Sequence, residues 1–117
     1  MAENHFESAL ILVPQGRGRT WVLSTPLVYY SVKFGEIVVP TGFECDLSSI
    51  PRFAWAIAPK TDYPQAGVTH DWLYRGRLMP RADCDAVYRE ALIVCGSSAW
   101  RAWFRWAVLR LFGWSAY

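Results

Sequence analysis

The chain has 117 residues, of which 53% are hydrophobic and 19% are charged, and its net charge is +2. This composition supports one compact domain with a hydrophobic core and excludes a disordered chain. Twelve lysines and arginines are offset by ten acids, so the dense basic face of a nucleic-acid binder is missing and no nucleic-acid partner is expected.

The first 40 residues favour β-structure. Runs of apolar, β-branched and aromatic residues occupy 9–13, 20–24, 27–32 and 36–40, with turn residues between them. Prolines stand at the ends of these runs, where the missing N–H group is tolerated. We therefore expect a small antiparallel sheet over about residues 6–40.

The rest of the chain reads as a proline-rich loop over residues 41–64 and three helices over residues 65–113. Proline suits the first turn of a helix, serine suits its cap, and glycine suits the position that follows its last turn. The residues that mark these boundaries are Pro64, Gly76, Pro80, Gly96, Ser97, Ser98 and Gly113. A sheet followed by a loop and three helices is an α+β fold in a single domain, residues 1–117.

The three cysteines, Cys45, Cys84 and Cys95, lack the paired spacing of a zinc site or a disulfide framework. We interpret them as free thiols in a reducing compartment. The N-terminal segment has acids before a short apolar run and does not read as a signal peptide. No apolar stretch reaches the roughly 18 residues that a membrane span needs, so we expect a protein kept in the cytosol.

The stretch "HDWLY", residues 70–74, contains the only histidine expected in the interior. His70 and Tyr74 are four residues apart and share one helix face, whereas Asp71 points about 100° away from it. A short link makes the first two helices neighbours, which could bring Asp85 against His70 and Tyr74. A histidine braced by a carboxylate has a fixed tautomer and suits a general base that acts on water.

The stretch "HDWLY" followed by "DCDAVY" resembles the His-Asp-x-x-Tyr and Asp arrangement of secreted phospholipase A2 enzymes, over residues 67–92. The resemblance implies ester hydrolysis with calcium as the cofactor. It assigns His70 as the base, Asp71 as a calcium ligand, Asp85 as the carboxylate that orients the histidine, and Tyr74 as the partner of that carboxylate. The glycine-rich calcium loop and the half-cystine framework of those enzymes are not evident in this sequence.

The stretch "GFECDLSSIPR", residues 42–52, places polar residues between apolar neighbours. Asp46 could be a second metal ligand, and Ser48, Ser49 and Arg52 could reach the substrate in the same pocket. The alternative is a loop that these side chains fold by hydrogen bonding to the backbone.

Over residues 21–112, the combination of "GF-x-x-D-x-S-S-I-P", "H-D-x-L-Y" and "A-D-x-D-x-x-Y" resembles a family of small bacteriophage and prophage proteins of unassigned function. The resemblance implies a phage setting. The expected location is then the host cytoplasm or the virion.

The last predicted helix is apolar on nearly all sides. One stripe at helical spacing is expected to pack on the core, and it consists of Trp100, Trp103, Phe104, Ala107, Val108 and Leu111. Further apolar residues lie on the opposite side, with arginines between them. We expect an interface that involves Trp103, Trp106, Leu109 and Phe112. Its partner would be a membrane lipid, a phage structural protein or a second copy of the chain.

Three functions stay open at this point. The leading hypothesis is an esterase similar to phospholipase A2, with His70 as the base and a phospholipid as the substrate. The alternative is a non-enzymatic virion or tail-assembly protein in which the His-Asp cluster is structural. A third possibility is a metal-dependent cell-wall hydrolase with His70, Asp71 and Asp46 as ligands, although a single interior histidine is a weak basis for a zinc site.

Overall fold

The computed structural model describes residues 3–14, 21–45 and 63–112, without the side chains of Cys45 and Phe112. Most of the predicted loop lies outside these ranges. The sequence-predicted residues that fall there are Asp46, Ser48, Ser49 and Arg52.

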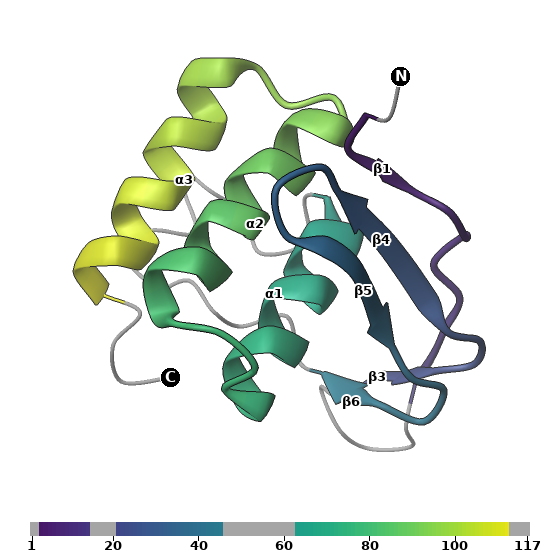
Figure 1. The fold of residues 1–117 in the computed structure, drawn as a ribbon. Helices are drawn as coiled ribbons and strands as arrows, with labels where there is room; N and C mark the ends of the chain where they lie inside the picture. The colour runs from purple at the N-terminus through teal and green to yellow at the C-terminus, as the bar shows by residue number, and fades with distance from the viewer. Residues whose placement is uncertain (1–2, 15–20, 46–62, 113–117) are drawn as a thin grey trace.

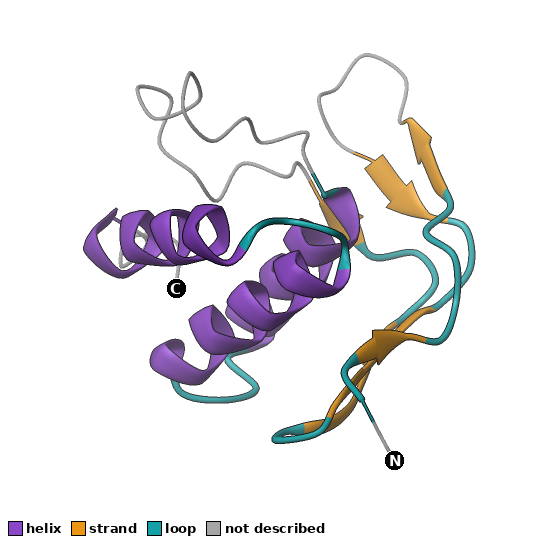
Figure 2. Ribbon diagram, turned by 90° about the horizontal axis from the view of Figure 1, so that it is seen from above, coloured by secondary structure: helices purple, strands orange, loops and turns teal. Residues whose placement is uncertain are grey.

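Within the described residues, three helices form one layer and short antiparallel strands form the other (Figure 1; Figure 2). The helices are α1 (Pro64–Gly76), α2 (Arg81–Val94) and α3 (Ala99–Phe112). The strands come first in the chain and the helices follow, which confirms the predicted α+β fold. Within the described part of the chain, no helix is both long enough and apolar enough to cross a membrane.

The strands form two small sheets where a single sheet was predicted. One sheet has the order β1 (His5–Phe6), β4 (Leu27–Ser31), β5 (Gly35–Val39). The other has the order β2 (Leu12–Pro14), β3 (Trp21–Leu23), β6 (Glu44–Cys45). All pairs are antiparallel. Strands of two or three residues are too short to show an alternating pattern, and for this reason β1 and β6 were not predicted.

The β4–β5 hairpin supplies the side of the strand layer that faces the helices. Alternate residues of β4 are buried, including Leu27 and Tyr29, as expected for a strand with one face on the core. Gly35 begins β5 with a φ of 86°, a conformation that glycine adopts without steric cost. The hydroxyl of Tyr29 donates a hydrogen bond of 2.9 Å to Glu90, which ties this sheet to α2.

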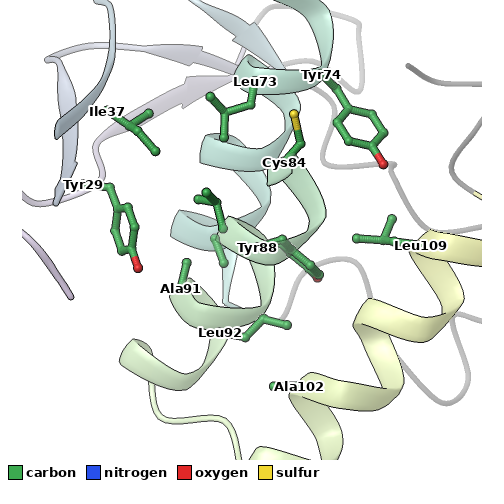
Figure 3. Packing of buried hydrophobic residues seen from close by; sticks show 12 residues of the cluster. Tyr29, Ile37, Leu73, Tyr74, Cys84, Tyr88, Ala91, Leu92, Ala102 and Leu109 are labelled. Atoms are coloured by element: carbon green, nitrogen blue, oxygen red, sulfur yellow. The ribbon is translucent and has the colours of Figure 1, made fainter. Parts of the chain in front are cut away.

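The core lies between this hairpin and the helices, with α2 at its centre. Figure 3 shows Tyr29 and Ile37 of the strands beside Leu73 of α1, and Leu109 of α3 on the far side of α2. A second buried cluster joins both sheets to α1 and consists of Leu23, Leu27, Val39 and Val68.

The predicted core face of α3 is partly wrong. Val108 is buried as expected, but Trp100, Trp103 and Leu111 are exposed. The side that packs inward instead carries Ala102, Arg105 and Leu109. A helix with apolar residues on most sides has no unique hydrophobic face, and the long stem of a buried arginine can occupy a core position.

Leu73 and Leu78 give a matched test of this packing, since the first is fully buried in the core and the second is exposed after α1. We expect Leu73→Ala to lower the free energy of unfolding by about 2–5 kcal/mol, because it removes buried methyl groups and leaves a cavity. We expect Leu78→Ala to change it by about 0.5 kcal/mol or less. Urea unfolding followed by circular dichroism measures both, and equal effects would contradict the packing described.

Candidate functional site

A buried histidine and a buried aspartate meet between α1 and α2, which lie side by side (Figure 1). The Nε2 atom of His70 is 2.9 Å from Oδ1 of Asp85, and both side chains have no solvent exposure. Tyr74, one turn after His70 on α1, donates its hydroxyl hydrogen bond to the same carboxylate oxygen. The structure therefore brings His70, Tyr74 and Asp85 together.

Two arginines approach the other oxygen of Asp85. Nη1 of Arg110 lies 3.1 Å from Oδ2, and Nε of Arg81 lies 3.9 Å from it. Burial by itself raises the pKa of Asp85, but the hydrogen bonds from His70, Tyr74 and Arg110 outweigh burial, and the pKa lies below its usual value. Asp85 is therefore an ionised carboxylate inside the protein, with donors on both oxygens.

Arg81 also fixes the end of α3. Its Nη2 atom donates to the backbone carbonyl groups of Leu109 and Arg110, and its Nε atom donates to the hydroxyl of Tyr74 at 3.2 Å. Carbonyl groups in the last turn of a helix lack partners within the helix, so a cation there is favourable. One side chain at the start of α2 thus joins all three helices at the site.

The ring of His70 lies against two tyrosine rings, with centroid distances of 4.0 Å to Tyr74 and 5.0 Å to Tyr88. Burial lowers the pKa of His70, and this effect exceeds the opposite effect of Asp85. The imidazole is therefore neutral at pH 7. Because ionised Asp85 only accepts hydrogen bonds, Nε2 carries the proton and Nδ1 keeps a lone pair. Nδ1 is buried, and no residue in the described ranges forms a hydrogen bond with it.

Asp71 faces away from this cluster, as its helical position predicts. Its carboxylate is mostly buried and forms an ion pair with Arg75 at 3.4 Å, one turn further along α1. A cation already balances the charge, and residues 3–14, 21–45 and 63–112 contain no group of three or more metal-ligating side chains. The described residues thus do not fit a calcium site. Calcium remains a prediction of the sequence resemblance.

Two cysteines, Cys84 and Cys95, have side chains that the structure describes. Cys84 and Cys95 are both free thiols, and Cys84 is buried in the core. Burial raises the pKa of the Cys84 thiol to about 11, so the unreactive neutral form dominates at neutral pH.

The residues predicted to form an interface on α3 have different surroundings. Trp103 is exposed, whereas Trp106 is half-buried with the guanidinium of Arg89 5.8 Å from its ring. Leu109 is fully buried in the core, so its assignment to a surface interface is wrong. The side chain of Phe112 lies outside the described residues.

A surface cavity of about 460 Å³ lies on the outer side of α2, away from the His-Asp pair. Its lining comes from the turn between β4 and β5, from α2 and from α3. The lining residues are Lys33, Phe34, Ala82, Asp83, Ala86, Arg89, Glu90, Ile93 and Trp106. His70 and Asp85 do not belong to this cavity.

Arg81 and Arg110 were missed from the sequence. Arg81 precedes Asp85 by four residues on one helix, so the spacing of helical ion pairs could have identified it. Arg110 reaches Asp85 from a different helix, and only the packing of α3 against α2 reveals that contact.

The fold and the site define a class: an α+β domain with a buried His-Asp pair that tyrosine and arginine side chains brace between three helices. The chain belongs to the family described as "Protein of unknown function (DUF1353)", whose model matches residues 21–109. That range includes both partners of the pair. No curated protein and no solved structure matches the chain.

The pH dependence of stability tests the neutral state of His70. The unfolded chain protonates this histidine below about pH 6.5, whereas the folded protein, with its lowered pKa, resists protonation. The unfolded state then binds more protons, so the free energy of unfolding falls as the pH drops from 7 to 5, by up to roughly 1.4 kcal/mol per pH unit. The lowered pKa of Asp85 acts only at more acidic pH.

Urea unfolding at several pH values between 5 and 7 measures this slope. We expect a shallower slope for His70→Gln, and a slope close to that of the wild type for His5→Gln, which keeps His70. A wild-type stability that is constant over this range would contradict a buried neutral imidazole.

The charge of Asp85 is tested by Asp85→Asn, with Asp83→Asn on the same helix as its control. The first change leaves Arg81 and Arg110 without their carboxylate, and breaking a buried ion pair costs about 3–5 kcal/mol. The second removes only a favourable charge in the first turn of α2, which costs about 1 kcal/mol or less. Thermal unfolding compares the two, and similar melting temperatures would rule out a central role for the Asp85 carboxylate.

Proposed function

We propose that this protein hydrolyses carboxylic esters, with phospholipids as the substrate class, and that His70 is the general base. One observation supports this most directly. The Nε2–H group of His70 donates a hydrogen bond to an ionised carboxylate, and the ring keeps a lone pair on a buried Nδ1 that has no hydrogen-bond partner in the described ranges. A base that is neutral, oriented and ready to accept a proton meets the first requirement of general-base catalysis.

In the proposed reaction, Nδ1 of His70 removes a proton from water as the water oxygen attacks the ester carbonyl carbon. Asp85 stabilises the imidazolium that forms, because its carboxylate already accepts the Nε2 hydrogen bond. The imidazolium then returns the proton to the leaving alkoxide, which departs as an alcohol. Tyr74 holds the carboxylate in place and does not contact the substrate.

The burial of the ring sets a requirement on this mechanism. His70 has no exposed surface, so water and an ester must gain access next to Nδ1 before reaction. The proposed reaction involves no metal ion, because Asp71 already pairs with Arg75 and the described residues contain no group of three or more metal-ligating side chains.

The second candidate is a non-enzymatic phage virion or tail-assembly protein, and a specific observation favours it. Asp85 accepts hydrogen bonds on both oxygens from α1 and α3, and the histidine is enclosed by aromatic rings. Such a buried network around a carboxylate fixes the mutual positions of helices without any chemistry.

Release of fatty acid from mixed vesicles of phosphatidylglycerol and phosphatidylcholine tests the hydrolase. We expect activity in the wild type and in His5→Gln, and a loss of about 100-fold or more in His70→Gln, the usual contribution of a general base. Parallel assays with calcium and with a chelator test the calcium predicted from the resemblance.

Wild-type protein that releases no fatty acid and cleaves no short-chain ester would eliminate the hydrolase. Co-purification of that inactive protein with phage tails would then support the structural role.

A further inference from the structure

Exposed apolar side chains gather where α2 ends and α3 begins. Ile93 and Val94 in the last turn of α2 are 47% and 36% exposed, and Trp100 and Trp103 in the first turns of α3 are 66% and 51% exposed. Together with Arg101, these residues form what we call the α2–α3 tip, which lies along the upper edge of the molecule in Figure 1. Exposed tryptophans are costly in water, and two in one helical turn mark a contact surface.

The backbone between the two helices of the tip is fixed by the conformation of Gly96 and by a hydrogen bond. Gly96 follows α2 with a φ of 107°, a left-handed conformation that closes the helix. The N–H group of Ser97 donates a hydrogen bond of 3.0 Å to the carbonyl group of Leu92, so the chain turns back tightly into α3. The apolar side chains are therefore presented by two packed helix ends.

The charge of this part of the chain has one sign. Glu90 is the last acid in the sequence, and the three charged residues after it are Arg101, Arg105 and Arg110. Arg105 is buried and Arg110 pairs with Asp85, whereas Arg101 is exposed and directly follows Trp100 in the sequence. Glu90 lies one turn before Ile93 and Val94, and its carboxylate accepts the hydrogen bond of Tyr29. Exposed tryptophans with an exposed arginine next in sequence are typical of the interfacial zone of an anionic membrane.

The cavity on the outer side of α2 continues the surface. Ile93 lines both the tip and the cavity, and Lys33 and Arg89 add exposed cations beside it. Two carboxylates also line the cavity, Asp83 and Glu90, and Glu90 accepts the hydrogen bond of Tyr29. The charges that line the cavity therefore cancel, and the exposed cation that belongs to the tip is Arg101.

We propose that the α2–α3 tip docks on an anionic lipid surface, with Trp100 and Trp103 in the interfacial zone and Arg101 against the phosphate groups. The proposal does not rest on the hydrolase function. Val94 is nine residues after Asp85 on α2, about 13 Å along the helix axis, so the tip and the His-Asp pair occupy different ends of the helix.

Co-flotation of the full chain with vesicles tests the proposal. We expect binding to vesicles that contain phosphatidylglycerol, weaker binding to pure phosphatidylcholine, and a loss of binding at high salt. The double change Trp100→Ala with Trp103→Ala should reduce vesicle affinity at least tenfold. Arg101→Gln should reduce it about fivefold, the usual effect of one basic residue at an anionic surface.

Matched controls separate the tip from general effects. Trp21→Ala changes an exposed tryptophan on β3, and Arg77→Gln changes an exposed arginine after α1, so both should bind vesicles as the wild type does. His70→Gln should also bind, and this distinguishes failure of docking from failure of hydrolysis. Circular dichroism verifies that each variant is folded.

Two results would overturn the proposal. One is a folded wild type that does not float with phosphatidylglycerol vesicles, or a double tryptophan variant that floats equally well. The other is a dimer in light scattering that the double variant converts to a monomer, because the tip would then be covered by a second copy of the chain.

Discussion

The buried carboxylate of Asp85 is the interaction on which the helical layer depends. It takes hydrogen bonds from His70 and Tyr74 on α1 and from Arg110 on α3, and Arg81 on its own helix stands close to it. An ionised group without solvent is stable only when donors surround it. The three helices must therefore keep this relative arrangement. Any sequence change that moves one of them exposes the Asp85 carboxylate to solvent or removes one of its hydrogen-bond donors.

Much of the fold could be predicted from local signals. The prolines and glycines at the helix ends predicted the boundaries of α1, α2 and α3 to within a few residues. These residue types restrict the backbone conformation at their own positions. The division into two sheets could not be predicted. It depends on β6 pairing with β3 across more than twenty residues, and a two-residue strand leaves no periodic pattern.

The contacts of the site could also be predicted only in part. His70 and Tyr74 share a helix face by spacing alone, and a short link between α1 and α2 was enough to place Asp85 near them. The contact of Arg110 with Asp85 could not be predicted, because it depends on which side of α3 faces inward. That side was misjudged because aromatic residues surround the helix and a buried arginine, Arg105, takes a core position.

The helix α3 links the two regions for which we propose functions. Its first turns carry Trp100 and Trp103, and its last turn carries Arg110 together with the carbonyl groups that Arg81 binds. A packed helix moves as a unit, so a displacement of its start would also move Arg110 relative to Asp85. The buried carboxylate would then lose a donor, and this cost holds α3 in its place against α2.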